Sequence, residues 1–222
     1  MNQMEYLVGD TPDRTTTSYV ETVPMRYTDE ETVVENVFLP FEDVSRVSPY
    51  YEAVEYLYEK GIMSGMAETV FSPDTTMTRA QFAALLSRLY RYDPDNYRGE
   101  MLYTDVPTKS WYAPYVSWVT ESGYMTGIGN GIFAPDGTVT REQMLTILGS
   151  VGRSMKLGKT ELQKLITIDR DNISAWALDG VDYCYTNGLI DEKYLYALSP
   201  ASYVKRSEVA KILYRFCGLG IL

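Results

Sequence analysis

The stretch TVTREQMLTIL at residues 138–148 has a near copy, TMTRAQFAALL, at residues 76–86. A more distant copy, SYVKRSEVAKIL, lies at residues 202–213. In each copy an Arg precedes apolar residues three and four positions apart, which is the spacing of an amphipathic helix. Self-similarity at a regular distance along the chain is typical of repeat proteins. We therefore take the repeat as the unit that decides the fold.

The similarity extends beyond these three stretches. Gly61, Gly123 and Gly188 each stand 18 residues before the Arg of their own copy. The sequence therefore predicts three repeats, preceded by an N-terminal extension or linker from an upstream domain and interrupted by a linker helix. The predicted bounds are 41–92, 103–153 and 167–218 for the repeats, 1–40 for the extension and 154–166 for the linker helix.

Within each repeat the pattern predicts a helix, a turn and a second helix. The first helix should stop at the Gly, which can adopt the left-handed conformation at a helix end. A turn containing Pro follows, FSPDTT in the first repeat and FAPDGT in the second. Thr78 and Thr140 then stand at the N-cap, with Gln81 and Gln143 at the capping-box distance. Lys205 takes this position in the third repeat and predicts a poorer helix start.

A two-helix unit of about 50 residues cannot bury its apolar face alone, so neighbouring copies must share a core. We expect a mainly α fold in which three tandem helix–loop–helix repeats surround a central helical bundle. The expected domain is pseudo-threefold and three-pronged. Three grooves should lie between neighbouring repeats.

The overall composition of the chain disfavours several classes of function. The chain has 222 residues, a formal net charge of −10 and no His. The charge disfavours nucleic acid as a partner, and the lack of His removes the commonest general base and metal ligand. No apolar run approaches the roughly 18 residues of a membrane span. The opening MNQMEYLVGD lacks the basic start and apolar core of a secretory signal, so we expect no membrane insertion and no signal peptide in this chain.

No motif for catalysis or cofactor binding stands out. No sequence motif indicates an activated Ser, Cys or Thr nucleophile, and none indicates a catalytic pair of carboxylates. The loop DPDNYRGEMLYTD at 93–105 begins like a calcium loop, but Arg98 replaces the required Gly and Thr104 the final Glu. We expect no enzyme activity, no metal and no cofactor. Cys184 and Cys217 are either small core residues or a disulfide between facing helices.

The repeats resemble the S-layer homology family. The second repeat carries YTDV, Trp111, GYMTG, FAPD and TREQ, and the first carries FEDV, GIMSG, FSPD and TRAQ. The third repeat is more distant, with TIDR, Trp176, GLI, LSP and KRSE. The resemblance covers residues 41–217.

This resemblance implies a non-catalytic module that anchors an exported protein at the surface of mostly Gram-positive bacteria, as in an S-layer. The implied partner is an anionic, often pyruvylated, secondary cell-wall polysaccharide that binds noncovalently in the grooves between repeats. The motif Arg faces the ketal carboxylate, the opening Asp and nearby Trp line the groove, and the second Gly lets the backbone approach the sugar. The ligand-binding residues implied in this way are Arg79, Arg141, Arg206, Asp43, Asp105, Asp169, Trp111, Trp176, Tyr50, Gly65 and Gly127.

Two departures from the family pattern matter. Pro49 stands at the Trp position of the first repeat, with Tyr50 beside it, and Glu192 replaces the second Gly of the third repeat. A carboxylate at that place would repel an anionic ligand. We expect a groove that uses Arg79 or Arg141 to bind, and the groove that depends on residues 188–195 not to bind.

Structural roles are open for the same residues. Each Arg could pair with an acidic residue of a first helix, and each Asp could cap the first helix of its repeat or the turn before that helix. The alternative function is a structural, self-assembly or protein-interaction scaffold of an S-layer-type surface protein whose glycan sites have decayed.

Overall fold

A computed structural model describes residues 39–220 of the chain. The extension predicted at 1–40 lies outside the described residues except for its last two positions. The chain divides into Met1–Leu39 and the compact unit Pro40–Leu222, which holds every helix named below. Within the described residues this unit has no strand, only isolated bridges between extended residues. The predicted mainly α class is confirmed.

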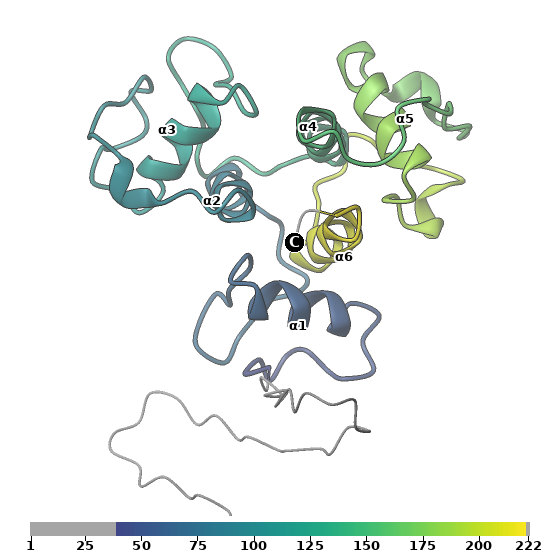
Figure 1. Cartoon of the computed structure of the whole chain (residues 1–222), viewed down its shortest axis with the longest axis horizontal. Helices are drawn as coiled ribbons and strands as arrows, with labels where there is room; N and C mark the ends of the chain where they lie inside the picture. The colour runs from purple at the N-terminus through teal and green to yellow at the C-terminus, as the bar shows by residue number, and fades with distance from the viewer. Residues whose placement is uncertain (1–38, 221–222) are drawn as a thin grey trace, which may run out of the picture. The chain divides into compact units, whose positions relative to one another are not determined.

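Each repeat contains two α-helices joined by an extended stretch and a turn (Figure 1). The first helices are α1 (Tyr51–Glu59), α3 (Ala113–Glu121) and α5 (Leu178–Thr186). The second helices are α2 (Arg79–Leu89), α4 (Arg141–Ser154) and α6 (Arg206–Cys217). Four short 3-10 helices lie in the loops: η1 (Pro94–Asn96), η2 (Arg170–Asn172), η3 (Ala175–Ala177) and η4 (Glu192–Tyr194).

The helix ends follow the local sequence. Gly61, Gly123 and Gly188 come just after the first helices with φ angles of 68°, 73° and 66°. Gly adopts this left-handed conformation without strain, so these residues end the helices as predicted. Thr78 and Thr140 cap α2 and α4 in complete capping boxes, each with the Gln three positions later.

The cap of α6 is weaker because Lys205 has no side-chain acceptor. Only half of the capping box forms there, since the Glu208 carboxylate accepts a hydrogen bond from the Lys205 backbone N–H at 3.2 Å. The prediction of a poorer start for the second helix of the third repeat is confirmed.

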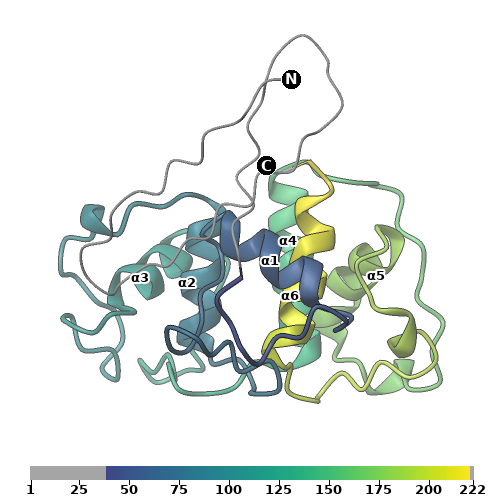
Figure 2. The same ribbon diagram turned by 90° about the horizontal axis from the view of Figure 1, so that it is seen from below.

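The second helix of each repeat packs on the first helix of the next repeat. α2 packs against α3, α4 against α5, and α6 returns to α1, which crosses in front of it in Figure 2. Backbone bridges join the segments before the second helices in the same cyclic order: Thr78 with Thr138, Thr140 with Tyr203, and Thr76 with Lys205. The pseudo-threefold symmetry stays a prediction, and this cyclic order of contacts supports it.

The core lies along the inner faces of the second helices. Phe82 of α2, Leu148 of α4 and Leu213 of α6 are fully buried, as their helical spacing predicts. Cys184 and Cys217 lie in the same core as free thiols. They are the small core residues of the first alternative, and they do not form a disulfide in the structure.

The segment 154–166 is not a helix beyond its first residue, so the predicted linker helix is wrong. Lys156 and Gly158 have positive φ angles of 57° and 66°, which break the helical hydrogen-bond pattern. Side chains of α5 accept hydrogen bonds that a helix would have made internally. The Asp182 carboxylate, for example, accepts the Leu165 backbone N–H at 2.8 Å.

The opening aspartates, Asp43, Asp105 and Asp169, each clamp two parts of their own repeat together. Every one accepts two backbone N–H groups from the turn before the second helix. The donors, at 2.6–2.8 Å, are in order Phe71 and Ser72, Phe133 and Ala134, and Leu198 and Ser199. Among the described residues no side chain caps α1, α3 or α5, so these aspartates do not cap the first helices. This carboxylate clamp fixes the turn from which the second helix starts.

Replacing Asp105 with Ala should lower the free energy of unfolding by about 3 kcal/mol. The change removes two charge-assisted hydrogen bonds and leaves two backbone donors unpaired. Urea unfolding followed by circular dichroism measures the loss. Asp136→Ala, an exposed position in the turn of the same repeat, is the control and should change the value by less than about 0.5 kcal/mol. Equal stability of the two variants would contradict the clamp.

The clamp also makes the fold sensitive to acid. Burial raises the pKa of Asp169, but hydrogen bonds from the Thr167 hydroxyl and from the Leu198 and Ser199 N–H groups outweigh it, so the pKa lies below its ordinary 3.8. The unfolded chain then takes up the proton first as the pH falls, and this contribution to stability is present above about pH 4 and lost below it. Asp169→Ala should show a shallower loss of stability than the unchanged chain between about pH 5 and pH 2.5. Parallel curves would contradict this.

Candidate functional site

Arg79, the first residue of α2, reaches across to the second repeat. Its Nε donates to the Phe133 carbonyl at 2.8 Å, and its Nη2 donates to the Thr126 carbonyl at 2.6 Å. The guanidinium lies over the Phe133 ring, 4.5 Å from its centroid. Burial lowers the pKa of Arg79, although Tyr103 and Asp105 act in the opposite direction. Two carbonyls and a ring hold the cation, and Nη1 has no partner among the described residues.

Arg206, the first residue of α6, repeats this geometry against the first repeat. It donates to the Phe71 carbonyl at 2.8 Å and the Ser64 carbonyl at 2.7 Å, and it lies 4.5 Å from the Phe71 ring centroid. Burial lowers its pKa to about 10, against the opposing charge of Asp43. Within residues 39–220, neither Arg206 nor Arg79 forms an ion pair with an acidic side chain, so the salt-bridge alternative is wrong for both.

The surface beside Arg206 is hollowed into a groove of about 280 Å³, which we call groove A. Its walls come from all three repeats: Arg206 from the third, Gly65 from the first and Trp111 from the second. The Trp111 side chain stays 58% exposed, so an aromatic face borders the groove. The lining holds a second cation, Arg88 of α2, and no carboxylate.

An equivalent groove of about 230 Å³, groove B, lies beside Arg79. It combines Arg79 of the first repeat, Gly127 of the second and Trp176 of the third, and Trp176 is 57% exposed. Gln143 of α4 lines groove B at the position that Gln81 of α2 takes in groove A. These glutamines and Arg88 are lining residues that the sequence analysis missed. The sequence marked the two glutamines only as members of the capping boxes, and it gave no signal for Arg88.

Gly65 and Gly127 are required by the packing of their own repeats. A Cβ atom at Gly65 would lie 2.4 Å from the Ala67 carbonyl oxygen, and one at Gly127 would lie 2.4 Å from the Ile132 carbonyl oxygen. Both distances are far inside van der Waals contact. The glycines are therefore explained without any ligand, and their predicted role in admitting a sugar stays a prediction.

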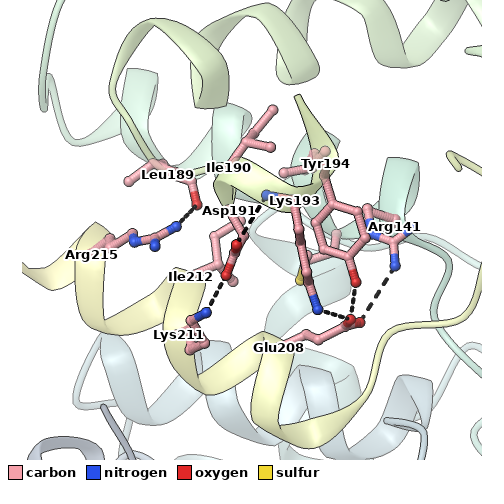
Figure 3. A pocket seen from close by; sticks show the side chains of 12 residues that line it. Arg141, Leu189, Ile190, Asp191, Lys193, Tyr194, Glu208, Lys211, Ile212 and Arg215 are labelled. Carbon is pink, nitrogen blue, oxygen red and sulfur yellow. Dashed lines mark hydrogen bonds and ion pairs between the residues drawn. The ribbon is translucent and has the colours of Figure 1, made fainter. Parts of the chain in front are cut away.

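The third equivalent position, groove C, surrounds Arg141 and is almost filled by side chains. Figure 3 shows the residues that line it. Arg141 is 5% exposed and donates from Nη1 to the carbonyls of Leu198 and Ser199 at 2.8 and 2.7 Å. The ring of Tyr194 lies over the guanidinium, 3.9 Å from it. The cavity that remains is about 30 Å³, close to the size of one water molecule.

Groove C corrects the expectation about which grooves are open. The sequence predicted that a groove using Arg79 or Arg141 binds and that the groove depending on residues 188–195 does not, but the structure brings Arg141 and that stretch into the same groove. Each Arg crosses into the following repeat, so Arg141 meets the third repeat. Arg206 meets the first repeat, where Gly65 leaves the groove open.

The remaining predicted residues lie away from the grooves. Tyr50 directly precedes α1, and it lines none of grooves A, B and C. Asp43, Asp105 and Asp169 also line none of them, because their carboxylates are engaged in the clamps. Of the predicted set, the structure therefore gathers six residues around two open grooves, and Arg141 lies in groove C. The six are Arg79, Arg206, Trp111, Trp176, Gly65 and Gly127.

Other kinds of site are not seen in the described part of the chain. No three Cys, Asp or Glu side chains in residues 39–220 are grouped so that they could hold a metal ion. In the same residues no helix combines the length and the apolar character needed to cross a bilayer.

A family model of the S-layer homology domain matches residues 40–83 and 102–145. Each match contains the clamping Asp, the Gly that ends the first helix, and the Arg that crosses to the next repeat. These two repeats belong to the S-layer homology family. The third repeat has the same clamp, the same Gly and the same crossing Arg.

The relatives carry this region as a small part of longer proteins. The chain is 30% identical over 196 residues to an endoglucanase of Bacillus sp. (strain KSM-635), covering 86% of this chain and 20% of that protein. It is 29% identical over 164 residues to an amylopullulanase of Thermoanaerobacterium thermosulfurigenes, covering 73% and 9%. It is 27% identical over 149 residues to the surface-layer 125 kDa protein of Lysinibacillus sphaericus, covering 67% and 12%.

The chain thus spans a fifth or less of the length of each of these relatives. The enzymes among them match through a small segment only. The S-layer homology region is a non-catalytic surface-anchoring module, and it is this region that surface-layer proteins and enzymes share with the chain.

Replacing Gly127 with Ala should destabilise the domain by about 2–3 kcal/mol, because the new methyl group overlaps the Ile132 carbonyl. The melting temperature measured by calorimetry reports the change. Glu192→Ala, at the exposed equivalent position of the third repeat, is the matched control and should melt like the unchanged chain. A Gly127→Ala chain of unchanged stability would show that the packing does not require Gly.

Proposed function

We propose that the chain is a non-catalytic anchor that binds an anionic, often pyruvylated, secondary cell-wall polysaccharide noncovalently through grooves A and B. One observation carries the proposal: Arg79 and Arg206 are largely buried cations that have no carboxylate partner within residues 39–220, and each borders an open groove. A buried charge is costly unless it is paired. An anionic group of a ligand would supply the missing partner.

The chemistry of the lining fits an acidic sugar. A planar guanidinium binds a carboxylate such as that of a pyruvate ketal through charge-assisted hydrogen bonds, which contribute about 1.5–3 kcal/mol each. The exposed faces of Trp111 and Trp176 offer flat apolar surfaces to sugar C–H groups. Neither groove presents a carboxylate that would repel the ligand.

An anchor of this kind lies outside the cell, in the cell wall or S-layer. The bacteria that carry such anchors are mostly Gram-positive. The relatives are long proteins in which the shared region is a minor part, which supports a further domain fused to it in the parent protein. The anchor would hold that domain at the surface without taking part in its reaction.

The second candidate is a structural, self-assembly or protein-interaction scaffold of an S-layer-type surface protein. Closed groove C favours it, because one of the three equivalent positions has no room for a sugar. In a scaffold of this kind the three repeats would keep their packing, and grooves A and B would not bind a glycan either.

Co-sedimentation with Gram-positive wall sacculi separates the two candidates. The purified chain should pellet with native sacculi and stay in the supernatant after acid extraction of the secondary polymer. Equal pelleting before and after extraction would contradict a polymer anchor. Failure to pellet with native sacculi from several sources, the host included, would favour the scaffold.

The two tryptophans provide the matching variants. Trp111→Ala and Trp176→Ala change exposed side chains, so the fold should persist while each lowers the affinity for sacculi about tenfold, the equivalent of about 1.4 kcal/mol. Tyr196→Ala is the control, since Tyr196 is an exposed aromatic residue that lines none of the three grooves. If all three variants bound alike, grooves A and B would not be the binding sites.

A further inference from the structure

Groove C contains a carboxylate of its own. Glu208 of α6 receives the Arg141 guanidinium at 3.5 Å, the Lys193 ammonium at 3.1 Å and the Tyr194 hydroxyl (Figure 3). The Lys205 backbone N–H completes the set at 3.2 Å. The Glu208 side chain is 15% exposed. The donors come from α4, from η4 and from the start of α6, so one carboxylate joins three elements.

This carboxylate replaces a neutral amide. Glu208 stands two positions after the Arg that begins its helix, where α2 has Gln81 and α4 has Gln143. The two glutamines line the open grooves A and B. An amide cannot neutralise a neighbouring guanidinium, whereas a carboxylate can.

The aromatic ring of groove C also comes from a different place. The ring against the guanidinium is Phe133 for Arg79 and Phe71 for Arg206, but the third repeat has Leu198 at that position. Tyr194 of η4 supplies the ring instead. The helix η4 lies where the first two repeats have the loop of the second Gly. The same change of sequence therefore removes this Gly, which lies beside the open grooves, and supplies the Tyr194 ring that covers Arg141.

The other cations of groove C are also satisfied within the chain. Lys211 is paired with Asp191, and Arg215 donates to the Leu189 carbonyl at 3.3 Å. The cavity between them is small and mainly apolar. Groove C therefore differs from grooves A and B, where Nη1 of the crossing Arg has no partner in the described part of the chain.

We propose that Glu208 is a built-in anion that fills groove C, so that the chain presents two ligand grooves and uses the third as a fastening between α4, η4 and α6. The inference rests on the proposed function of grooves A and B. A carboxylate already attached to the chain loses no translational freedom on binding, and it competes with free ligand at an effective concentration in the millimolar range, on the order of 1 mM or more.

The electrostatics support a charged Glu208. Burial raises the pKa of its carboxyl, but hydrogen bonds from Tyr194, Lys193 and the Lys205 N–H, together with the charge of Arg141, outweigh it and hold the pKa below the ordinary 4.5. At neutral pH the groove therefore contains its counter-ion.

Isothermal titration with a monosaccharide that carries a pyruvate ketal counts the sites. The unchanged chain should bind two molecules, and the double variant Tyr194→Ala with Glu208→Gln should bind three. Glu208→Gln installs the residue that α2 and α4 already have at this position, so the helix start should persist. Three sites in the unchanged chain, or two in the folded double variant, would overturn the inference.

Glu192→Gln is the matched control. It removes a carboxylate from the same stretch of the third repeat without touching the contacts of Glu208, and it should leave two sites. A third site in this variant would show that repulsion by Glu192, not occupation by Glu208, closes the groove.

A measurement without sugar separates this inference from the proposed function. The titration midpoint of the Glu208 carboxyl carbon, followed by NMR, should lie below 4.5 and rise in Tyr194→Phe, which removes the hydroxyl and keeps the ring. A midpoint at or above 4.5 overturns the inference. A low midpoint in a chain that binds no sugar would support the fastening and contradict the proposed function of grooves A and B.

Discussion

The guanidinium at the start of each second helix finds its acceptors in the following repeat, and this constraint orders the whole domain. A backbone carbonyl accepts such a bond best at a short distance and a favourable angle, and a fixed turn holds it in that geometry. The Asp clamps fix these turns at their neighbouring N–H groups. The contact between neighbouring repeats thus depends on the crossing Arg, and the crossing Arg depends on the Asp clamp. This relation holds from the first repeat to the second, from the second to the third, and from the third back to the first. A groove arises beside each crossing.

The same constraint has two chemical outcomes. Where the repeat that receives the Arg keeps its second Gly, as at Gly65 and Gly127, the cation borders an open groove with no carboxylate. Where η4 replaces this Gly, Tyr194 and Glu208 cover and neutralise the cation. One fold therefore builds open grooves bordered by a cation and a closed internal ion pair from equivalent positions, and the two outcomes differ in a few residues.

Local features were predictable from the sequence because a few neighbours determine them. Gly61 ends its helix and Thr78 caps the next, since each depends on residues at most three or four positions away. The partner of Arg141 was not predictable, because the order in which repeats pack is a tertiary property. The same reason explains the failure at 154–166, where contacts with α5 outweigh helical spacing. The effect of Glu208 on groove C required the position of Tyr194, which no local pattern gives.

The central claim is that the unpaired cations of grooves A and B bind the anion of a wall polysaccharide. Arginine side-chain NMR signals, recorded while a pyruvylated monosaccharide is added to the whole chain, test it most directly. The signals of Arg79 and Arg206 should shift with the binding curve while the signal of Arg141 stays in place. A shift of Arg141 with no change at Arg79 and Arg206 would contradict the account.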